Sequence, residues 1–188
     1  MDVTVTTQTA GKAKLPADLA EVFDYWTATR GDAAYPSWRA FKLDELPLPL
    51  IPWAVVVDVI EAPEKEPDFI YRFWGTMRAE FQGQDPTGQS VHAIEPPDIA
   101  HKVFLEFMET FETGEAQYIV TKIEYDERET SHWETLRLPL SDDGKTINKI
   151  FGVSTRNQYT RSYFEALKRA PPINYVLRHP NWFKIETE

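Results

Sequence analysis

The chain has 188 residues and a mass of 21.8 kDa, which suits one domain with extensions. It contains no cysteine, so disulfides, thiol catalysis and metal sites held by thiolates are excluded. The net charge of −10 argues against nucleic acid and anionic membranes as partners. Its 11 Phe, 8 Tyr and 6 Trp can fill a core or line a cavity, which argues against disorder of the whole chain.

The first 14 residues are polar and lack the basic start and apolar core of a signal peptide. We expect residues 1–14 to form a mobile leader. No stretch of the sequence approaches the ~20 apolar residues of a membrane span. These two observations predict a cytoplasmic protein.

Residues 15–52 are expected to hold an N-terminal helix followed by a connector. The helix is predicted at residues 16–30, and prolines prevent a continuous helix over residues 35–52. An apolar stripe on this helix is our candidate for a dimer or partner interface, with packing inside the chain as the alternative. The stripe consists of Leu19, Val22, Phe23 and Trp26.

Two strands and two helices are predicted next. β-branched and aromatic runs predict strands at residues 53–60 and 69–74, paired as a hairpin. A short helix is expected at residues 75–82, and a longer one at residues 98–113. The longer helix has an apolar face, which leaves Lys102 and Glu106 on its opposite, charged face.

Three further strands are predicted at residues 117–125, 131–140 and 147–155, with a hairpin turn at Asp143-Gly144. A last helix is expected at residues 157–169. Because strands and helices do not alternate, the pattern predicts an α+β fold: a five-stranded antiparallel sheet with helices on one face, an N-terminal helical cap and a C-terminal extension. The core would occupy residues 53–155, and a C-terminal helix and tail residues 156–188. This last segment has a net charge of +3, so it is suited to docking on an acidic surface.

Two segments of the predicted core resemble PAS sensory domains, specifically a bacterial subfamily in which these domains often stand alone. One segment extends from Tyr71-Arg72 through Gly75-Thr76 and Asp85 to Gly88. The other is the run Leu-Pro-Leu-Ser-Asp-Asp-Gly at residues 138–144. The likeness covers roughly residues 20–155, and it implies the fold described above, in which two strands and a helical middle precede three strands.

The resemblance implies that this chain has the cavity of a PAS domain, which lies between the inner sheet face and the helical middle. Aromatic and methionine side chains would suit a small apolar or planar ligand there, unless they fill the space themselves. Two strand arginines, Arg72 and Arg137, could clamp a carboxylate or phosphate if they point inward, or else form salt bridges. The residues that we expect to line the cavity are Trp74, Met77, Phe81, Phe104, Phe107, Met108, Tyr118, Val120 and Trp133.

The sequence leaves the cofactor unknown: haem and flavin are both open to a fold of this kind, but neither is supported. His101 lies at the flank of its helix and His92 in a loop, and a flavin photosensor of this family needs a reactive cysteine. A zinc site that combines these histidines with Glu95 and His132 matches no compact motif, so no metal is predicted. Residue patterns typical of catalysis, such as a phosphate loop or a nucleophile elbow, are missing from the sequence.

These observations predict a stand-alone PAS-type sensory or regulatory domain that binds a small ligand, a protein partner, or both. We expect a homodimer that acts in signal transduction through another protein and has no catalytic activity of its own. The alternative is a small-molecule-binding α+β enzyme that uses the same cavity.

Overall fold

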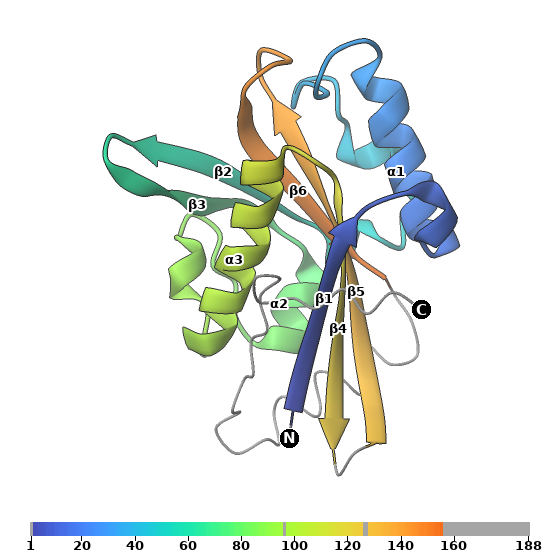
Figure 1. The fold of residues 1–188 in the computed structure, drawn as a ribbon, viewed down its shortest axis with the longest axis vertical. Helices are drawn as coiled ribbons and strands as arrows, with labels where there is room; N and C mark the ends of the chain where they lie inside the picture. Colours follow the sequence, from blue (N-terminus) through green and yellow to red (C-terminus); the bar gives the residue numbers. More distant parts are fainter. Residues whose placement is uncertain (1, 96, 126–127, 156–188) are drawn as a thin grey trace.

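A computed structural model describes residues 2–95, 97–125 and 128–155, with side chains omitted at Asp2–Thr6, Ala13 and residues 122–132. The expected helix at residues 157–169 lies outside this range. The described chain forms one antiparallel sheet with the strand order β1-β4-β5-β6-β2-β3, together with three α-helices (Figure 1). This α+β architecture confirms the predicted class and is consistent with a PAS-like fold. Within these residues, no helix is long and apolar enough to cross a membrane.

The strand pairs follow from the hairpins predicted along the sequence. β2 (Val55–Ala62) pairs with β3 (Lys65–Trp74), β4 (Gln117–Tyr125) with β5 (Arg128–Ser141), and β5 with β6 (Ile147–Ser154). β6 then pairs with β2 and joins the two halves of the sheet. Between β3 and β4 the chain forms α2 (Thr76–Gln82) and α3 (Pro97–Thr113).

Within the described residues the sheet has six strands, not the five predicted. The additional strand is β1 (Asp2–Thr9), which pairs with β4 at the edge of the sheet, within the segment expected to be a mobile leader. Its sequence, DVTVTTQT, is rich in β-branched residues, which favour extended backbone. Its polarity therefore marks an edge strand and not a leader without structure.

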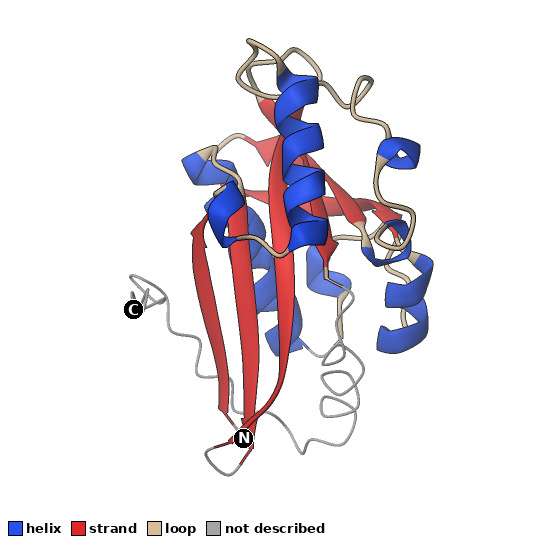
Figure 2. Cartoon of the chain, turned by 90° about the vertical axis from the view of Figure 1, so that its right-hand side faces the viewer, coloured by secondary structure: helices blue, strands red, loops and turns tan. Residues whose placement is uncertain are grey.

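Helices cover both faces of the sheet. The side chains of β5 alternate between these two faces. Leu136, Leu138 and Leu140 point to one face, which we call the α1 face because α1 (Ala17–Arg30) packs on it. Arg137 points to the opposite face, which we call the α3 face. Figure 2 shows α1 in front of the sheet, in the place of the predicted N-terminal cap. The expectation that all helices of the core lie on one face holds for α2 and α3.

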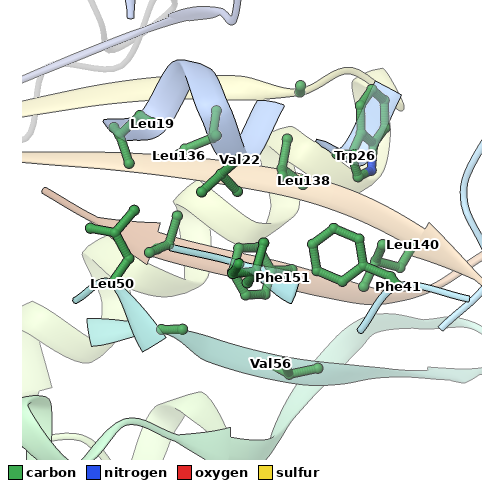
Figure 3. Close-up of a cluster of buried hydrophobic side chains, with 14 of the residues drawn as sticks. Leu19, Val22, Trp26, Phe41, Leu50, Val56, Leu136, Leu138, Leu140 and Phe151 are labelled. Atoms are coloured by element: carbon green, nitrogen blue, oxygen red, sulfur yellow. The ribbon is translucent and has the colours of Figure 1, made fainter. Parts of the chain in front are cut away.

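The apolar stripe of α1 is buried inside the chain. Leu19 and Val22 are completely buried, and Trp26 is 5% exposed and donates a hydrogen bond from Nε1 to the carbonyl oxygen of Pro139 at 2.9 Å. Figure 3 shows these side chains directed at the leucines of β5 and at Phe151 of β6. Phe23 is half-buried against the same cluster. This packing corrects the expectation that the stripe contacts another chain, and it supports the alternative of packing inside the chain.

Gly75 allows α2 to begin close to the connector. A Cβ atom at this position would lie 2.2 Å from the carbonyl oxygen of Pro52 and 2.9 Å from that of Ala54. Its φ of −64° suits any residue, so the need for glycine is one of space and not of backbone freedom. The chain therefore turns from β3 into α2 where two backbone segments meet.

We predict that Trp26→Ala destabilises the chain by about 3–5 kcal/mol, because it removes a buried ring and a buried hydrogen bond. Urea unfolding measures this change. Leu48→Ala is the control, since Leu48 is 73% exposed and its loss should cost no more than about 0.5 kcal/mol. Sedimentation of folded Trp26→Ala should show the wild-type assembly state. A changed assembly state with unchanged stability would show that Trp26 contacts another chain.

We predict that Gly75→Ala costs more than about 2 kcal/mol, because the new methyl group must displace backbone atoms. Gly11→Ala is the matched control, since its backbone is extended and a Cβ there meets nothing within 4 Å. Thermal unfolding of both variants tests the difference. Equal melting temperatures would show that the close approach at Pro52 does not constrain the fold.

Candidate functional site

The candidate site is the α3-face cluster, a set of buried polar and aromatic side chains between α2, α3 and the sheet. Its apolar frame consists of Val55 and Val57 of β2, Ile150 of β6 and aromatic rings from β3 and α3. The polar members come from α2, α3 and β5. The cluster consists of Tyr71, Trp74, Arg78, Lys102, Glu106, Phe107 and Arg137.

A buried ion triad connects α3 to β5. Arg137 Nη2 donates to Glu106 Oε2 at 2.9 Å, and Lys102 Nζ lies 2.6 Å from Glu106 Oε1. The side chains of all three residues are no more than 6% exposed. This placement corrects the expectation that Lys102 and Glu106 lie on a charged outer face of the helix. The inward Arg137 requires a carboxylate from α3, and Lys102 is one turn before that carboxylate.

The two cations determine the charge state of Glu106. Burial by itself would raise the pKa of this carboxyl group, but Lys102 and Arg137 outweigh burial and hold the pKa below its ordinary value of 4.5. Glu106 is therefore ionised at neutral pH. One carboxylate then faces two cations, which leaves the triad with a net charge of +1.

Arg137 is enclosed more completely than it is hydrogen-bonded. Its guanidinium carbon lies 4.1 Å from the ring centroid of Phe107, and a Cβ at Gly152 would lie 2.3 Å from its Nη1. Gly152 is therefore needed to make room for the arginine. Among the described residues, Nε and Nη1 of Arg137 find no hydrogen-bond partner, and neither does Nε1 of Trp74. Buried donors in this state are uncommon in folded proteins.

Arg78 attaches α2 to the sheet, and it is not among the site residues predicted from the sequence. Its Nε donates to the carbonyl oxygen of Trp53 and its Nη2 to Ser154 Oγ, both at 2.7 Å. The guanidinium also lies over the rings of Trp74 and Trp133, at 5.6 and 5.2 Å from their centroids. One sequence signal could have indicated that Arg78 is buried: it lies in a short helix that follows a strand without a polar linker.

The structure divides the predicted cavity residues between two faces. Trp74, Phe104 and Phe107 are buried in the α3-face core, and Met108 is half-buried against it. Phe81 and Trp133 lie beside Trp53, at ring distances of 5.2 and 5.7 Å. Met77 is half-buried on α2.

Tyr118 and Val120 lie on the α1 face, so they cannot line a cavity shared with Phe107. Tyr118 is opposite Leu136 in the β4–β5 register and packs in the α1-face core. Its hydroxyl donates to Glu134 Oε1 at 2.8 Å, and burial together with this bond raises its pKa. The alternation of β4 separates the two sets of side chains, but it does not show which set faces α3.

The remaining polar candidates are at the surface. Arg72 pairs with Asp58 across the β2–β3 hairpin, with 2.7 Å between Nη2 and Oδ2, so it takes the salt-bridged role. His92 and His101 are exposed, and the ring of His92 lies 4.8 Å from that of Phe104. The described part of the chain shows no group of three or more His, Asp or Glu residues placed to hold a metal ion.

Comparisons with known proteins do not assign the chain to a family. No family model and no curated protein matches the chain. A solved structure described as "Flavin Analogue Sheds Light on Light-Oxygen-Voltage Domain Mechanism" is similar to it with a TM-score of 0.38 and 16% identity. The similarity covers 61% of this chain and 84% of that chain. At this TM-score it adds nothing to the fold assignment, which rests on the strand order.

We predict that Glu106→Gln destabilises the chain by about 3–5 kcal/mol at pH 7, because it leaves two buried cations without a carboxylate. Replacing all three ionic side chains, as in Lys102→Met, Glu106→Leu and Arg137→Met together, should restore much of this loss. Urea unfolding measures both changes. A single variant as stable as the wild type would show that the triad does not hold α3.

The same triad predicts a pH dependence. Because the pKa of Glu106 is lowered by folding, its contribution to stability is full at neutral pH and is lost as the pH falls below about 4.5 toward its folded pKa. The triple variant should lose less stability than the wild type between pH 6 and pH 4. Unfolding curves at the two pH values test this expectation, and equal losses would contradict it.

Proposed function

We propose that this chain is a PAS-type sensory or regulatory domain that binds a small ligand in the α3-face cluster. The supporting observation is the state of Arg137, a buried arginine with two nitrogen atoms that lack hydrogen-bond partners in the described chain. Leaving a buried donor unpaired costs about 1–3 kcal/mol. A ligand with acceptor atoms would remove this cost, so the free energy of binding would include it.

The neighbouring groups suit a planar ligand that carries an acceptor. Trp74 offers an indole N–H, and its ring centroid lies 4.7 Å from that of Tyr71 at an interplanar angle of 83°. The triad adds a net positive charge. In the structure these side chains pack against one another, so the ligand would enter as α3 moves away from the sheet.

The proposed output is contact with another protein, and the domain itself would carry out no reaction. Ligand binding would change how α3 sits on the sheet, because its Glu106 shares Arg137 with the ligand. A partner could read that change at the surface of α3, where His101 and Glu112 are exposed. This proposal places the regulatory signal in the helical layer.

Native mass spectrometry of the purified full chain tests ligand binding. We expect a bound small molecule that is released when the protein unfolds. Arg137→Met should lose most of this bound fraction, whereas Arg72→Met, which removes an exposed arginine of β3, should retain it. Circular dichroism verifies that both variants are folded.

A wild-type chain found only at its sequence mass, with no melting shift in a panel of aromatic carboxylates and their neutral alcohols, would contradict the proposed ligand site. If only the alcohols raised the melting temperature, the result would contradict the role of Arg137 and would indicate an apolar ligand site.

A further inference from the structure

The two edges of the sheet differ in how they end. At the β3 edge, the segment after α2 covers part of the strand: Tyr71 N donates to Gln89 O at 2.9 Å, and Gly88 N donates to Tyr71 O at 2.7 Å. The far end of β3 carries the sequence KEPD at residues 65–68, with a proline and three charges. Charges, proline and a covering segment all prevent an edge strand from pairing with another chain.

Within the described residues, the β1 edge has less of this protection, although Thr7 itself is only 7% exposed. β1 contains no proline or lysine, its only charged residue is Asp2, and its register with β4 is unbroken from Asp2 to Thr9. The strand order ends at β1, and no described backbone group bonds to its outer side. An uninterrupted edge with high β-propensity is a template for another strand.

The register shows which groups face outward. Ala10 N donates to Ala116 O at 2.6 Å, which makes this opposed pair a hydrogen-bonded one. Hydrogen-bonded and non-bonded pairs alternate along an antiparallel ladder, so the even-numbered residues of β1 bond to β4. The N–H and C=O groups of the odd-numbered residues therefore point to the free edge. These residues are Val3, Val5, Thr7 and Thr9.

We propose that β1 is a dimerisation edge that pairs antiparallel with β1 of a second copy of this chain. A two-fold axis at Thr6 places Val5 opposite Thr7 and Val3 opposite Thr9, so each outward residue meets another outward residue. In this register Asp2 lies opposite Ala10 and not opposite a second Asp2, so like charges are kept apart. The pairing is the same on both chains, as a two-fold dimer requires.

A second copy fits this edge better than an unrelated strand because the pattern complements itself. The buried stripe of α1 removes the other surface that the sequence suggested for dimerisation. The proposed dimer would have one continuous sheet through both chains. It does not depend on the ligand site, which lies on the face of the sheet beneath α3.

Hydrogen exchange resolved to single amides tests the proposal on the full, unmodified chain. The amides of Thr4, Thr6 and Gln8 bond to β4 and should be protected at all concentrations. The amides of Val3, Val5, Thr7 and Thr9 should be protected at about 500 µM protein, and their protection should fall at least about tenfold when dilution converts the dimer to monomer. Sedimentation at the same concentrations reports the assembly state.

Each alternative has its own result. Fast exchange of the odd-numbered amides in a dimeric sample would place the dimer contact elsewhere and overturn the proposal. Protection of these amides in a monomeric sample would show that a segment of the same chain covers the edge, and it would also overturn the proposal.

A pair of variants separates edge pairing from folding. Val5→Pro removes one outward N–H and leaves the bonds between β1 and β4 in place, and edge strands tolerate proline at such positions. Val5→Thr is the control, because it keeps the N–H and the β-branched shape. We expect Val5→Pro to weaken dimerisation at least about tenfold and Val5→Thr to leave it unchanged. A folded Val5→Pro chain that dimerises as the wild type does would contradict the proposal.

Discussion

The inward direction of Arg137 constrains the whole α3 face. Strand alternation places three leucines of β5 against α1, and it thereby directs Arg137 to the opposite side, under α3. A buried guanidinium needs a carboxylate, which Glu106 provides, and a residue without a side chain beside it, which Gly152 provides. The orientation of α3 and the sequence of β6 at Gly152 are therefore both tied to one arginine.

This constraint gives the two cores different characters. The α1-face core is apolar, and the one indole N–H that it receives from α1 is bonded to a backbone carbonyl. The α3-face core combines aromatic rings with a buried ion triad. Replacing a buried ion pair by apolar residues is often neutral or stabilising, so burial of charge is not explained by stability alone. The proposed role in ligand recognition would give these charges a physical reason to be there.

The elements with strong patterns could be predicted from the sequence. The periodic apolar residues of α1 and α3, and the β-branched runs of β2 and β4, identified these elements close to their observed bounds. β1 was missed because its alternation of valine and threonine has little hydrophobic contrast. A strand at the edge of a sheet does not need that contrast.

The candidate site was harder to predict because it depends on tertiary contacts. A helical wheel places Lys102 and Glu106 away from the apolar arc, and nothing local shows that an arginine of β5 faces them. Tyr118 was assigned to the wrong face for a related reason. Alternation defines two faces of β4, and only the β4–β5 register with Leu136 and Arg137 shows which helix covers each face.

The same contacts determine where a signal can leave the domain. The six strands are joined by backbone ladders that a ligand cannot shift without breaking many hydrogen bonds together. Among the described residues, no backbone ladder joins α3 to the sheet. Side chains of α3 contact the sheet, and the buried ionic link passes through Glu106, which would share Arg137 with the ligand. A ligand at Arg137 would therefore move α3 and leave the sheet, including its β1 edge, unchanged. Assembly through β1 and response through α3 would then be separate properties of one domain, with the dimer bringing two responsive helices into one particle.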